Sequence, residues 1–336
     1  LFDPFYVYHK PLPGLKAVLN DKEYQCVGTL RHFDYDAVIA GSSVCENFNN
    51  GWFDEGFGCR SVKAIRSYGA TADLMYLMDV CFEDHEIEQV FYNIDPSSLY
   101  ADTETTYEST GCPTYLYDKN PLNDYQYLLN KDVLLEKIPF MLAKSVSDYD
   151  EGDSYNWAQW KTFHHLMCMQ MYERLDDVKP MEDAHMYDEL AIANTRMLTD
   201  MIEAHPETEF RFFFSPYSMC WWDNAYRNGE RDAVLNAERI CIEALIEHDN
   251  VHVYYYQDDV DVITNLDNYM DTIHFSKEIN HYVCDSIKEG RDEITPSNVD
   301  SVLDGMYELS EKIVDEYIHE YIMTSKNYIG HFLSPE

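Results

Sequence analysis

Residues 35–48 read YDAVIAGSSVCENF, and this stretch decides the fold class. Its first part, DAVIAG at 36–41, is an apolar run too short for a helix, and it stops at a glycine followed by two serines. A short run that is apolar on both faces and ends in turn residues is typical of a buried strand in a parallel sheet. We therefore predict a strand at 36–41 and a strand-to-helix turn at Gly41, Ser42 and Ser43.

Four more segments show the same pattern and alternate with helical patterns. The further predicted strands are 61–67, 88–94, 209–215 and 250–257. Helical periodicity is found at 70–85, 188–205, 230–248 and 276–290. Strands that alternate with helices predict an α/β fold whose parallel sheet of five strands is covered by helices on both faces.

One region breaks this alternation. Residues 104–187 are rich in Tyr, Asn, Asp and Trp, and we interpret them as a mainly helical insertion within a single domain that spans 1–336. Long insertions at the carboxyl ends of strands often shape a ligand site, because a rigid scaffold carries them. After Pro296 an amphipathic pattern predicts a C-terminal helical extension at 296–336.

Composition excludes several classes of function. The 336 residues include 62 acidic against 24 basic side chains, a formal charge of -38, which excludes a nucleic-acid partner because such binding rests on basic clusters. There is no run of about 18 apolar residues, so no membrane span is predicted in this chain. The nine cysteines form no C-x-x-C pair, which favours free thiols over a disulfide framework or a zinc cluster.

No metal or organic cofactor is predicted. Neither a phosphate-binding G-x-x-x-x-G-K nor a dinucleotide-binding G-x-G-x-x-G motif is present. His164 and His165 are adjacent, and neighbouring residues of a helix point to different faces, so we do not expect them to bind one ion together.

Ser43 lies where a strand ends and a helix begins. Gly-Ser-Ser at such a place is by itself usually a helix cap, and a serine nucleophile needs a base and a group that orients the base. The stretch NYMDTIHFSKEINHYV at 268–283 follows the last predicted strand and places Asp271 three residues before His274. At that spacing the carboxylate can reach one imidazole nitrogen while the other faces a partner. We therefore predict a catalytic triad of Asp271, His274 and one of the two serines, Ser42 or Ser43.

These motifs together resemble the SGNH (GDSL-like) hydrolase superfamily. The resemblance consists of Gly-x-Ser after the first strand, the glycine of SYGAT (67–71) after the second, and Asp-x-x-His before the last helix. It covers about 36–96 and 209–290, and it implies a flavodoxin-like three-layer α/β/α sandwich with a five-stranded parallel sheet.

The resemblance also assigns roles to residues. Alignment of GSS with the superfamily's GDS motif implies that Ser43, rather than Ser42, is the nucleophile. The resemblance also implies that His274 is the general base and Asp271 its orienting acid. The backbone N–H groups of Ser43 and Gly69 would form the oxyanion hole, with Asn93 as the third donor.

Two positions depart from the superfamily pattern. In FYNIDPSSL (91–99) Asn93 falls inside the predicted strand and Asp95 at its end, where a carboxylate would repel an oxyanion. Losing one oxyanion donor costs roughly 10²–10³ in rate. The first motif also reads GSS rather than GDS, with Cys45 in place of the last glycine of a G-x-S-x-G elbow.

With these departures the chain resembles a divergent branch of the superfamily whose members act on cell-envelope polymers. Examples are proteins of alginate O-acetylation and teichoic-acid D-alanylation. This branch implies an extracytoplasmic domain, membrane-anchored through a segment outside this chain. The nine thiols favour a reducing compartment, so a cytoplasmic location stays open.

Two functions follow as expectations. The first is a serine esterase or O-acyltransferase acting on an O-acylated carbohydrate or cell-envelope polymer, with Tyr217, Trp221 and Trp222 as substrate-binding aromatics. Most such rings fill cores, so a packing role competes with that assignment. The alternative is a catalytically weak SGNH-like module that binds polysaccharide or a membrane acyltransferase partner.

Overall fold

The computed structural model describes residues 2–326 and 329. These residues form an α/β fold with one six-stranded sheet in the order β2-β1-β3-β4-β5-β6. The α/β prediction is confirmed, but the count of five strands is wrong. The sixth strand, β6 (Glu293–Ile294), has two residues and pairs antiparallel with β5. A two-residue strand with one charged side chain leaves no apolar run in the sequence, which explains why it was not predicted.

The five predicted strands are all present. Every residue of β1 is buried, as expected for a strand covered on both faces. The bounds are β1 (Ala37–Gly41), β2 (Ser61–Ile65), β3 (Gln89–Asn93), β4 (Glu209–Phe214) and β5 (Val251–Tyr255). β1 pairs parallel with β2, and β4 pairs parallel with β5.

The chain divides into two compact units. Unit 1 comprises residues 1–91 and 104–156, and unit 2 comprises 92–103 and 157–336. The predicted insertion at 104–187 is therefore shared between the units, with its first part in unit 1 and the remainder in unit 2.

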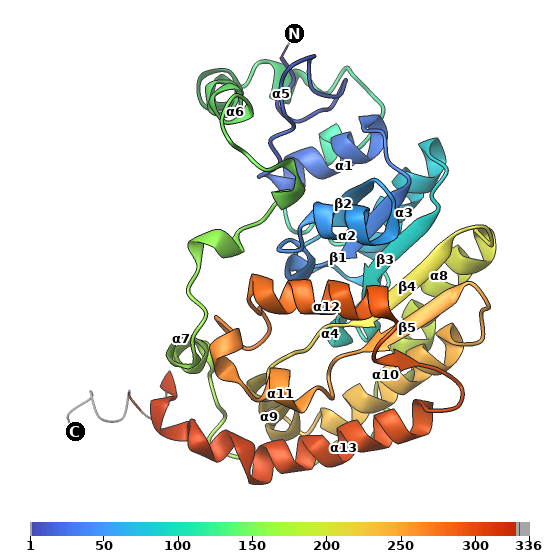
Figure 1. Ribbon diagram of the computed structural model, residues 1–336, viewed down its shortest axis with the longest axis vertical. Helices are drawn as coiled ribbons and strands as arrows, with labels where there is room; N and C mark the ends of the chain where they lie inside the picture. The colour runs from blue at the N-terminus through green and yellow to red at the C-terminus, as the bar shows by residue number, and fades with distance from the viewer. Residues whose placement is uncertain (1, 327–328, 330–336) are drawn as a thin grey trace. The chain divides into compact units, whose positions relative to one another are not determined.

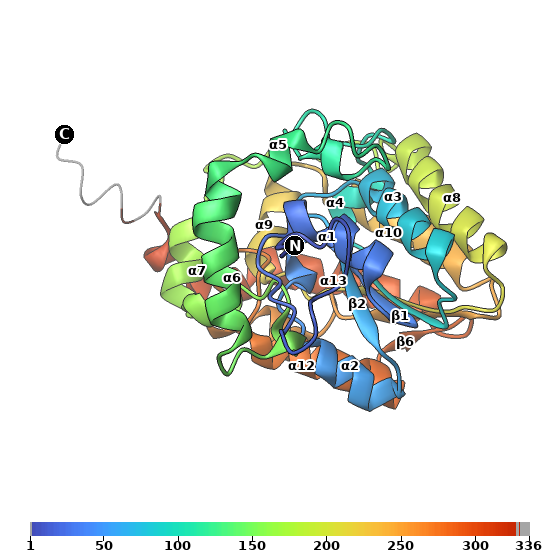
Figure 2. The same ribbon diagram turned by 90° about the horizontal axis from the view of Figure 1, so that it is seen from above.

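Unit 1 is built around β1 and β2. Figure 2 shows α1 and α3 on one side of these strands and α2 on the other. α2 ends because Gly58 takes a left-handed conformation with φ 69°, which glycine adopts without strain. The helices are α1 (Lys22–His32), η1 (Ser43–Cys45), α2 (Asn50–Phe57), α3 (Thr71–Asp84), η2 (Thr114–Leu116), α5 (Tyr125–Leu128), η3 (Val133–Lys137), α6 (Ile138–Ser145) and η4 (Glu151–Asp153).

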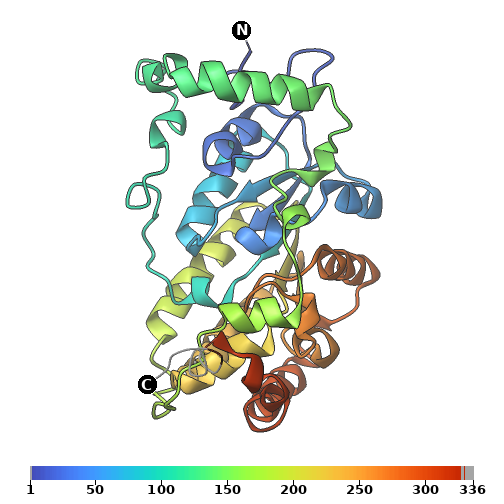
Figure 3. The same ribbon diagram turned by 90° about the vertical axis from the view of Figure 1, so that its left-hand side faces the viewer.

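The insertion residues of unit 1 carry an exposed apolar surface. The π-helical turn η3 runs directly into α6, and Figure 3 shows the two as one rod. Met141 and Ser145 are buried on one face of this rod, whereas leucines on its other faces are open to solvent. The most exposed apolar side chains around it are Leu122, Leu129, Leu134, Leu135 and Val146. We call these five residues the apolar surface of the insertion.

Unit 2 contains β4, β5, β6 and most of the long helices. α8 packs against α10, and α13 packs against α9 and α10 (Figure 1). The helices are α4 (Pro96–Leu99), η5 (Ala158–Trp160), α7 (His165–Met171), α8 (Asp188–Ala204), α9 (Met219–Arg227), α10 (Arg231–Leu245), α11 (Val260–Ile263), η6 (Leu266–Asn268), α12 (Lys277–Glu289), α13 (Val299–Asp315), η7 (Tyr317–Glu320) and η8 (Ile322–Thr324).

The predicted C-terminal extension is helical where the structure describes it. α13, η7 and η8 account for most of 299–324, and the part of the prediction that falls on 327–328 and 330–336 lies outside the described residues. Within the described part of the chain, no helix is both long enough and apolar enough to cross a membrane.

Candidate functional site

Ser43 occupies the strand-to-helix turn that the sequence indicates. It follows β1 and begins the 3-10 turn η1, in which the Cys45 N–H donates to the carbonyl of Ser42 at 3.0 Å. Ser42 holds the N-cap position in an extended conformation, but its side chain makes no capping hydrogen bond. The side chain of Ser42 therefore does not cap the helix, which is the usual role of a serine at this position.

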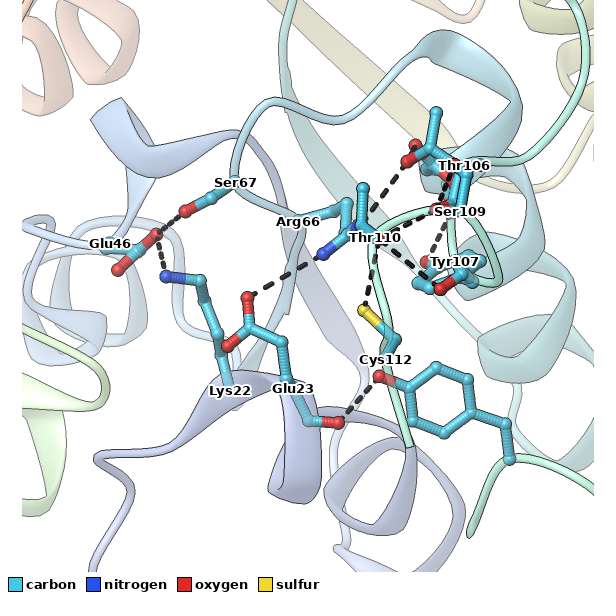
Figure 4. Close-up of polar contacts among 12 residues, drawn as sticks. Lys22, Glu23, Glu46, Arg66, Ser67, Thr106, Tyr107, Ser109, Thr110 and Cys112 are labelled. Atoms are coloured by element: carbon cyan, nitrogen blue, oxygen red, sulfur yellow. Dashed lines mark hydrogen bonds and ion pairs between the residues drawn. The ribbon is translucent and has the colours of Figure 1, made fainter. Parts of the chain in front are cut away.

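A buried glutamate joins this turn to two other elements of unit 1. Oε1 of Glu46 accepts a hydrogen bond from Oγ of Ser67 at 2.8 Å and lies 2.9 Å from Nζ of Lys22 (Figure 4). Burial raises the pKa of Glu46, and the charge of Lys22 opposes that rise. The turn after β1, the turn after β2 and α1 are thus tied together by one carboxylate.

Arg66 anchors the turn after β2 from its other end. Its guanidinium lies 5.0 Å from the ring of Tyr107 and donates to the hydroxyls of Thr106 at 3.2 Å and Thr110 at 2.5 Å. It also lies 3.7 Å from the carboxylate of Glu23 (Figure 4). The planar guanidinium packs on an aromatic ring and donates hydrogen bonds from its own edge at the same time. Arginine provides this geometry and lysine does not.

Gly69 closes the turn that Arg66 opens. A Cβ at Gly69 would lie 2.8 Å from Cγ of Arg66 and 2.9 Å from its carbonyl oxygen, so only glycine fits. Its N–H donates to that carbonyl at 3.1 Å, and Tyr68 between them has a positive φ of 55° and is almost fully exposed. The N–H expected to bind an oxyanion is therefore engaged within its own turn, and it becomes available only if this turn opens.

A buried lysine lies beneath the same network. Lys63, at the centre of β2, donates from Nζ to the carbonyls of Glu46 at 2.8 Å and Ser154 at 2.5 Å. Burial lowers its pKa to about 7. Neither Lys63 nor Glu46 is among the predicted site residues. A lysine in the middle of the apolar strand SVKAI was the available signal.

Unit 2 brings Asp271 and His274 together. Nδ1 of His274 lies 2.7 Å from Oδ2 of Asp271, while Oδ1 accepts the backbone N–H groups of Ile273 at 2.9 Å and His274 at 2.8 Å. Burial alone would raise the pKa of Asp271, but the hydrogen bonds and charge of His274 outweigh it and hold the pKa below its usual range. Asp271 is therefore an ionised acceptor at neutral pH.

The loop that carries these two residues is held by its neighbours in unit 2. Sγ of Cys168, on α7, donates to the carbonyl of Asp271 at 3.2 Å, and Oγ of Ser218 donates to the carbonyl of Thr272 at 2.7 Å. The ring of Trp157 meets the imidazole of His274 nearly at right angles, with 4.9 Å between centroids. The histidine thus has a packed side as well as a hydrogen-bonded one.

Asn93 and Asp95 form a buried cluster with other residues of unit 2. Nδ2 of Asn93 donates to Oδ1 of Asp95 at 2.8 Å, and the hydroxyl of Tyr217 donates to the same oxygen at 2.6 Å. Oδ1 of Asn93 accepts from Oγ of Ser215. One of the two amide hydrogens of Asn93 is therefore bound to Asp95, and this hydrogen is not available to an oxyanion.

The three predicted substrate-binding aromatics differ in exposure. Trp222 has no exposed surface, and its Nε1 donates to Oε1 of Gln257 at 3.0 Å. Tyr217 is also buried, whereas Trp221 is partly exposed and meets both of the other rings edge to face. Tyr217 and Trp222 would have to leave the core to contact a sugar, so Trp221 alone retains an accessible face.

The expectation that His164 and His165 point apart is wrong. α7 begins only at His165, and His164 precedes it in an extended conformation with φ -172° and ψ 143°. Their ring centroids lie 4.1 Å apart, and the carboxylate of Asp267 is beside them. The helix rule fails here because one of the two residues is not helical.

No model of a known protein family matches the chain. A search of curated proteins also finds no significant match. Of the predicted triad, Ser43 belongs to unit 1, and Asp271 and His274 belong to unit 2.

Proposed function

We propose that the chain is a serine esterase or O-acyltransferase of the SGNH type that acts on an O-acylated carbohydrate or cell-envelope polymer. The observation that carries the proposal is the 2.7 Å contact between Nδ1 of His274 and Oδ2 of Asp271. A buried, ionised carboxylate bound to one imidazole nitrogen is the arrangement that prepares the other nitrogen to take a proton. The three-layer α/β/α sandwich and an extracytoplasmic location are parts of the same proposal.

The proposed reaction has two halves. Ser43 attacks the ester carbonyl while Nε2 of His274 takes the hydroxyl proton, and this proton then passes to the leaving alcohol. The acyl group on Ser43 is released to water in hydrolysis or to a sugar hydroxyl in transfer, with His274 now acting as base toward the acceptor. The proposal requires Oγ of Ser43 to come within about 3 Å of Nε2 during the reaction.

Covalent labelling tests this requirement. A fluorophosphonate probe, followed by intact mass, should add one label to the wild type and none to Ser43→Ala or His274→Ala. Ser42→Ala is the matched control, because it changes the neighbouring serine and should still be labelled. Label that persists in Ser43→Ala, or a wild type that takes none while correctly folded, contradicts the proposal.

A second function is favoured by two observations. The N–H of Gly69 is bound to the carbonyl of Arg66, and one of the two amide hydrogens of Asn93 is bound to Asp95, so one expected oxyanion donor is engaged and a second is engaged in part. The five side chains of the insertion's apolar surface are also 63–84% exposed, and they are therefore accessible to a partner. Both observations suit a catalytically weak module that binds polysaccharide or a membrane acyltransferase.

The two functions are distinguished when fluorophosphonate labelling and polysaccharide binding are both measured. A binding module should take no label, yet its migration should slow in native gels that contain O-acetylated polysaccharide. De-O-acetylated polysaccharide is the control ligand. An enzyme should be labelled and should release acetate from the acetylated polymer.

A further inference from the structure

Three potential metal ligands of unit 2 converge at a place the proposed reaction does not use. Ligand atoms of His164, His165 and Asp267 all lie within 4.8 Å of one another. Oδ1 of Asp267 is 2.6 Å from Nδ1 of His165 and 3.8 Å from Nε2 of His164. The side chains are 45%, 31% and 57% exposed in the order His164, His165 and Asp267, so a hydrated ion could reach them directly.

The backbone holds the two segments of this cluster in place. The N–H of His164 donates to the carbonyl of Tyr269 at 3.0 Å, and the N–H of His165 donates to Oδ1 of Asp267 at 2.9 Å. Asp267 lies in η6, whose first turn is capped by the side chain of Asn265. The two backbone segments that carry the ligands are therefore held together without an ion.

We propose that His164, His165 and Asp267 bind one divalent transition-metal ion of the Zn²⁺ type, with water completing the coordination. Two imidazoles with one carboxylate suit zinc and its neighbours, whereas Mg²⁺ and Ca²⁺ prefer oxygen ligands throughout. Ligand atoms about 2.0–2.2 Å from a tetrahedral ion lie roughly 3.3 Å from one another. Asp267 must move away from His165 by less than about 1 Å, and His164 must approach Asp267 by less than about 1 Å. The ligand nitrogens of His164 and His165, which lie within 4.8 Å of each other, must approach by up to about 1.5 Å.

Binding of an ion would change which nitrogen carries the proton on each imidazole. Without metal, Nδ1 of His165 shares a proton with Asp267, and Nδ1 of His164 accepts the N–H of Leu166 at 3.2 Å. A neutral imidazole that ligates through one nitrogen carries its proton on the other. Binding therefore shifts the proton of His165 to Nε2 and that of His164 to Nδ1, which gives up the bond from Leu166.

The site would cross-link two segments that already support the Asp271–His274 pair. The segment 164–168 bonds to the loop through His164, His165 and Cys168, and the last of these bonds ends on the carbonyl of Asp271. A bound ion would hold α7 to this loop by a stronger link than hydrogen bonds alone. The inference does not depend on the proposed function, because metal binding can be measured without any turnover.

Titration with Zn²⁺, and with Co²⁺ as a spectroscopic probe, tests the site in the whole chain. Excess Mg²⁺ should occupy the many surface carboxylates. The wild type should bind one ion per chain, with a visible Co²⁺ spectrum that lacks a thiolate charge-transfer band. His164→Gln, His165→Gln and Asp267→Asn should each weaken binding at least 10-fold, since each removes one ligand.

The matched control is the double variant His281→Gln/Asp285→Asn. Its histidine and aspartate lie 3.8 Å apart on α12 and are similarly exposed, but they form no three-ligand group among the described residues. This variant should bind as the wild type does. Binding that is absent in the wild type, or equal in all four variants, or dominated by thiolate absorption, would overturn the proposal.

Discussion

Nδ1 of His274 lies 2.7 Å from Oδ2 of Asp271, while Oδ1 of the same carboxylate accepts the N–H of His274 itself. Ile273 supplies a third donor, so the carboxylate is fixed by the backbone before it orients the ring. An acceptor at Nδ1 places the proton of the neutral imidazole on that nitrogen. The unprotonated nitrogen is then Nε2, the atom that a serine hydroxyl would need.

Asp271→Asn should abolish the preference of His274 for a proton on Nδ1, while the loop keeps its conformation. The Oδ1 of asparagine can still accept the two backbone N–H groups, but its NH2 faces Nδ1 and forces the proton onto Nε2. We expect fluorophosphonate labelling to slow by roughly 10³–10⁴-fold, with little change in unfolding free energy. Asp261→Asn, at an exposed position of α11, is the control and should label at the wild-type rate. Equal labelling rates in the two variants would remove Asp271 from the mechanism.

Glu46→Gln tests the carboxylate that joins the turns after β1 and β2. Glutamine can still accept from Ser67, but Lys22 loses its partner in a largely buried position. We expect a loss of about 1–3 kcal/mol in unfolding free energy, measured by denaturant titration. Because Ser43 and Glu46 share one turn, labelling of Ser43 should also slow.

A surface ion pair of unit 1 supplies the control for Glu46. Lys119 and Glu83 lie 2.6 Å apart, but both side chains are more than half exposed. Glu83→Gln should therefore cost less than about 1 kcal/mol. Lys22→Met combined with Glu46→Gln should be no less stable than Glu46→Gln alone, since the lysine is then no longer left unpaired. Equal losses at Glu46 and Glu83 would show that the buried pair has no special role.

Gly69→Ala tests whether the turn after β2 has room for a side chain. The added Cβ would lie 2.9 Å from the carbonyl oxygen of Arg66, which belongs to the same turn and cannot move away alone. We expect a loss of about 1–3 kcal/mol in unfolding free energy. Gly305→Ala is the control, because a Cβ there meets nothing within 4 Å and α13 should gain up to about 1 kcal/mol. A neutral Gly69→Ala would mean that the turn adapts easily.

Local patterns account for what the sequence predicts well. The strands at 36–41 and 209–215 are recognisable because a short run apolar on both faces is a local property, and helices such as α8 follow from a 3.6-residue period. The Asp271–His274 contact is also local, since three residues separate the partners. These features do not depend on what the rest of the chain does.

The features that were missed depend on contacts between distant segments. Trp222 looks like an accessible ring in the sequence, and only the fold buries it against Gln257. Lys22 and Glu46 lie 24 residues apart, so their pairing leaves no local signal. The prediction for His164 was wrong because α7 begins at His165, one residue later than the prediction assumed. His164 is therefore extended, and its side chain points toward that of His165 rather than away from it.

Glu238 should give the protein a stability that falls as pH rises. Its carboxyl group is fully buried on α10, the hydroxyl of Tyr255 donates to Oε2 at 2.7 Å, and Oε1 has no hydrogen-bond partner. Burial raises its pKa to about 8 from an ordinary value of 4.5. Between these two values the folded chain holds a proton that the unfolded chain has released. The stabilising contribution is thus complete below about pH 4.5 and is lost progressively up to about pH 8.

Glu238→Gln should remove this pH dependence, because glutamine stays neutral and can still accept from Tyr255. Denaturant unfolding of both proteins between about pH 5 and pH 8 should show the wild type losing about 1.4 kcal/mol per pH unit relative to the variant. Glu247→Gln, at an exposed position just beyond α10, should follow the wild-type curve. Parallel curves for the wild type and Glu238→Gln would mean that the buried carboxyl group is already ionised at neutral pH, with Tyr255 and the surrounding core stabilising its charge.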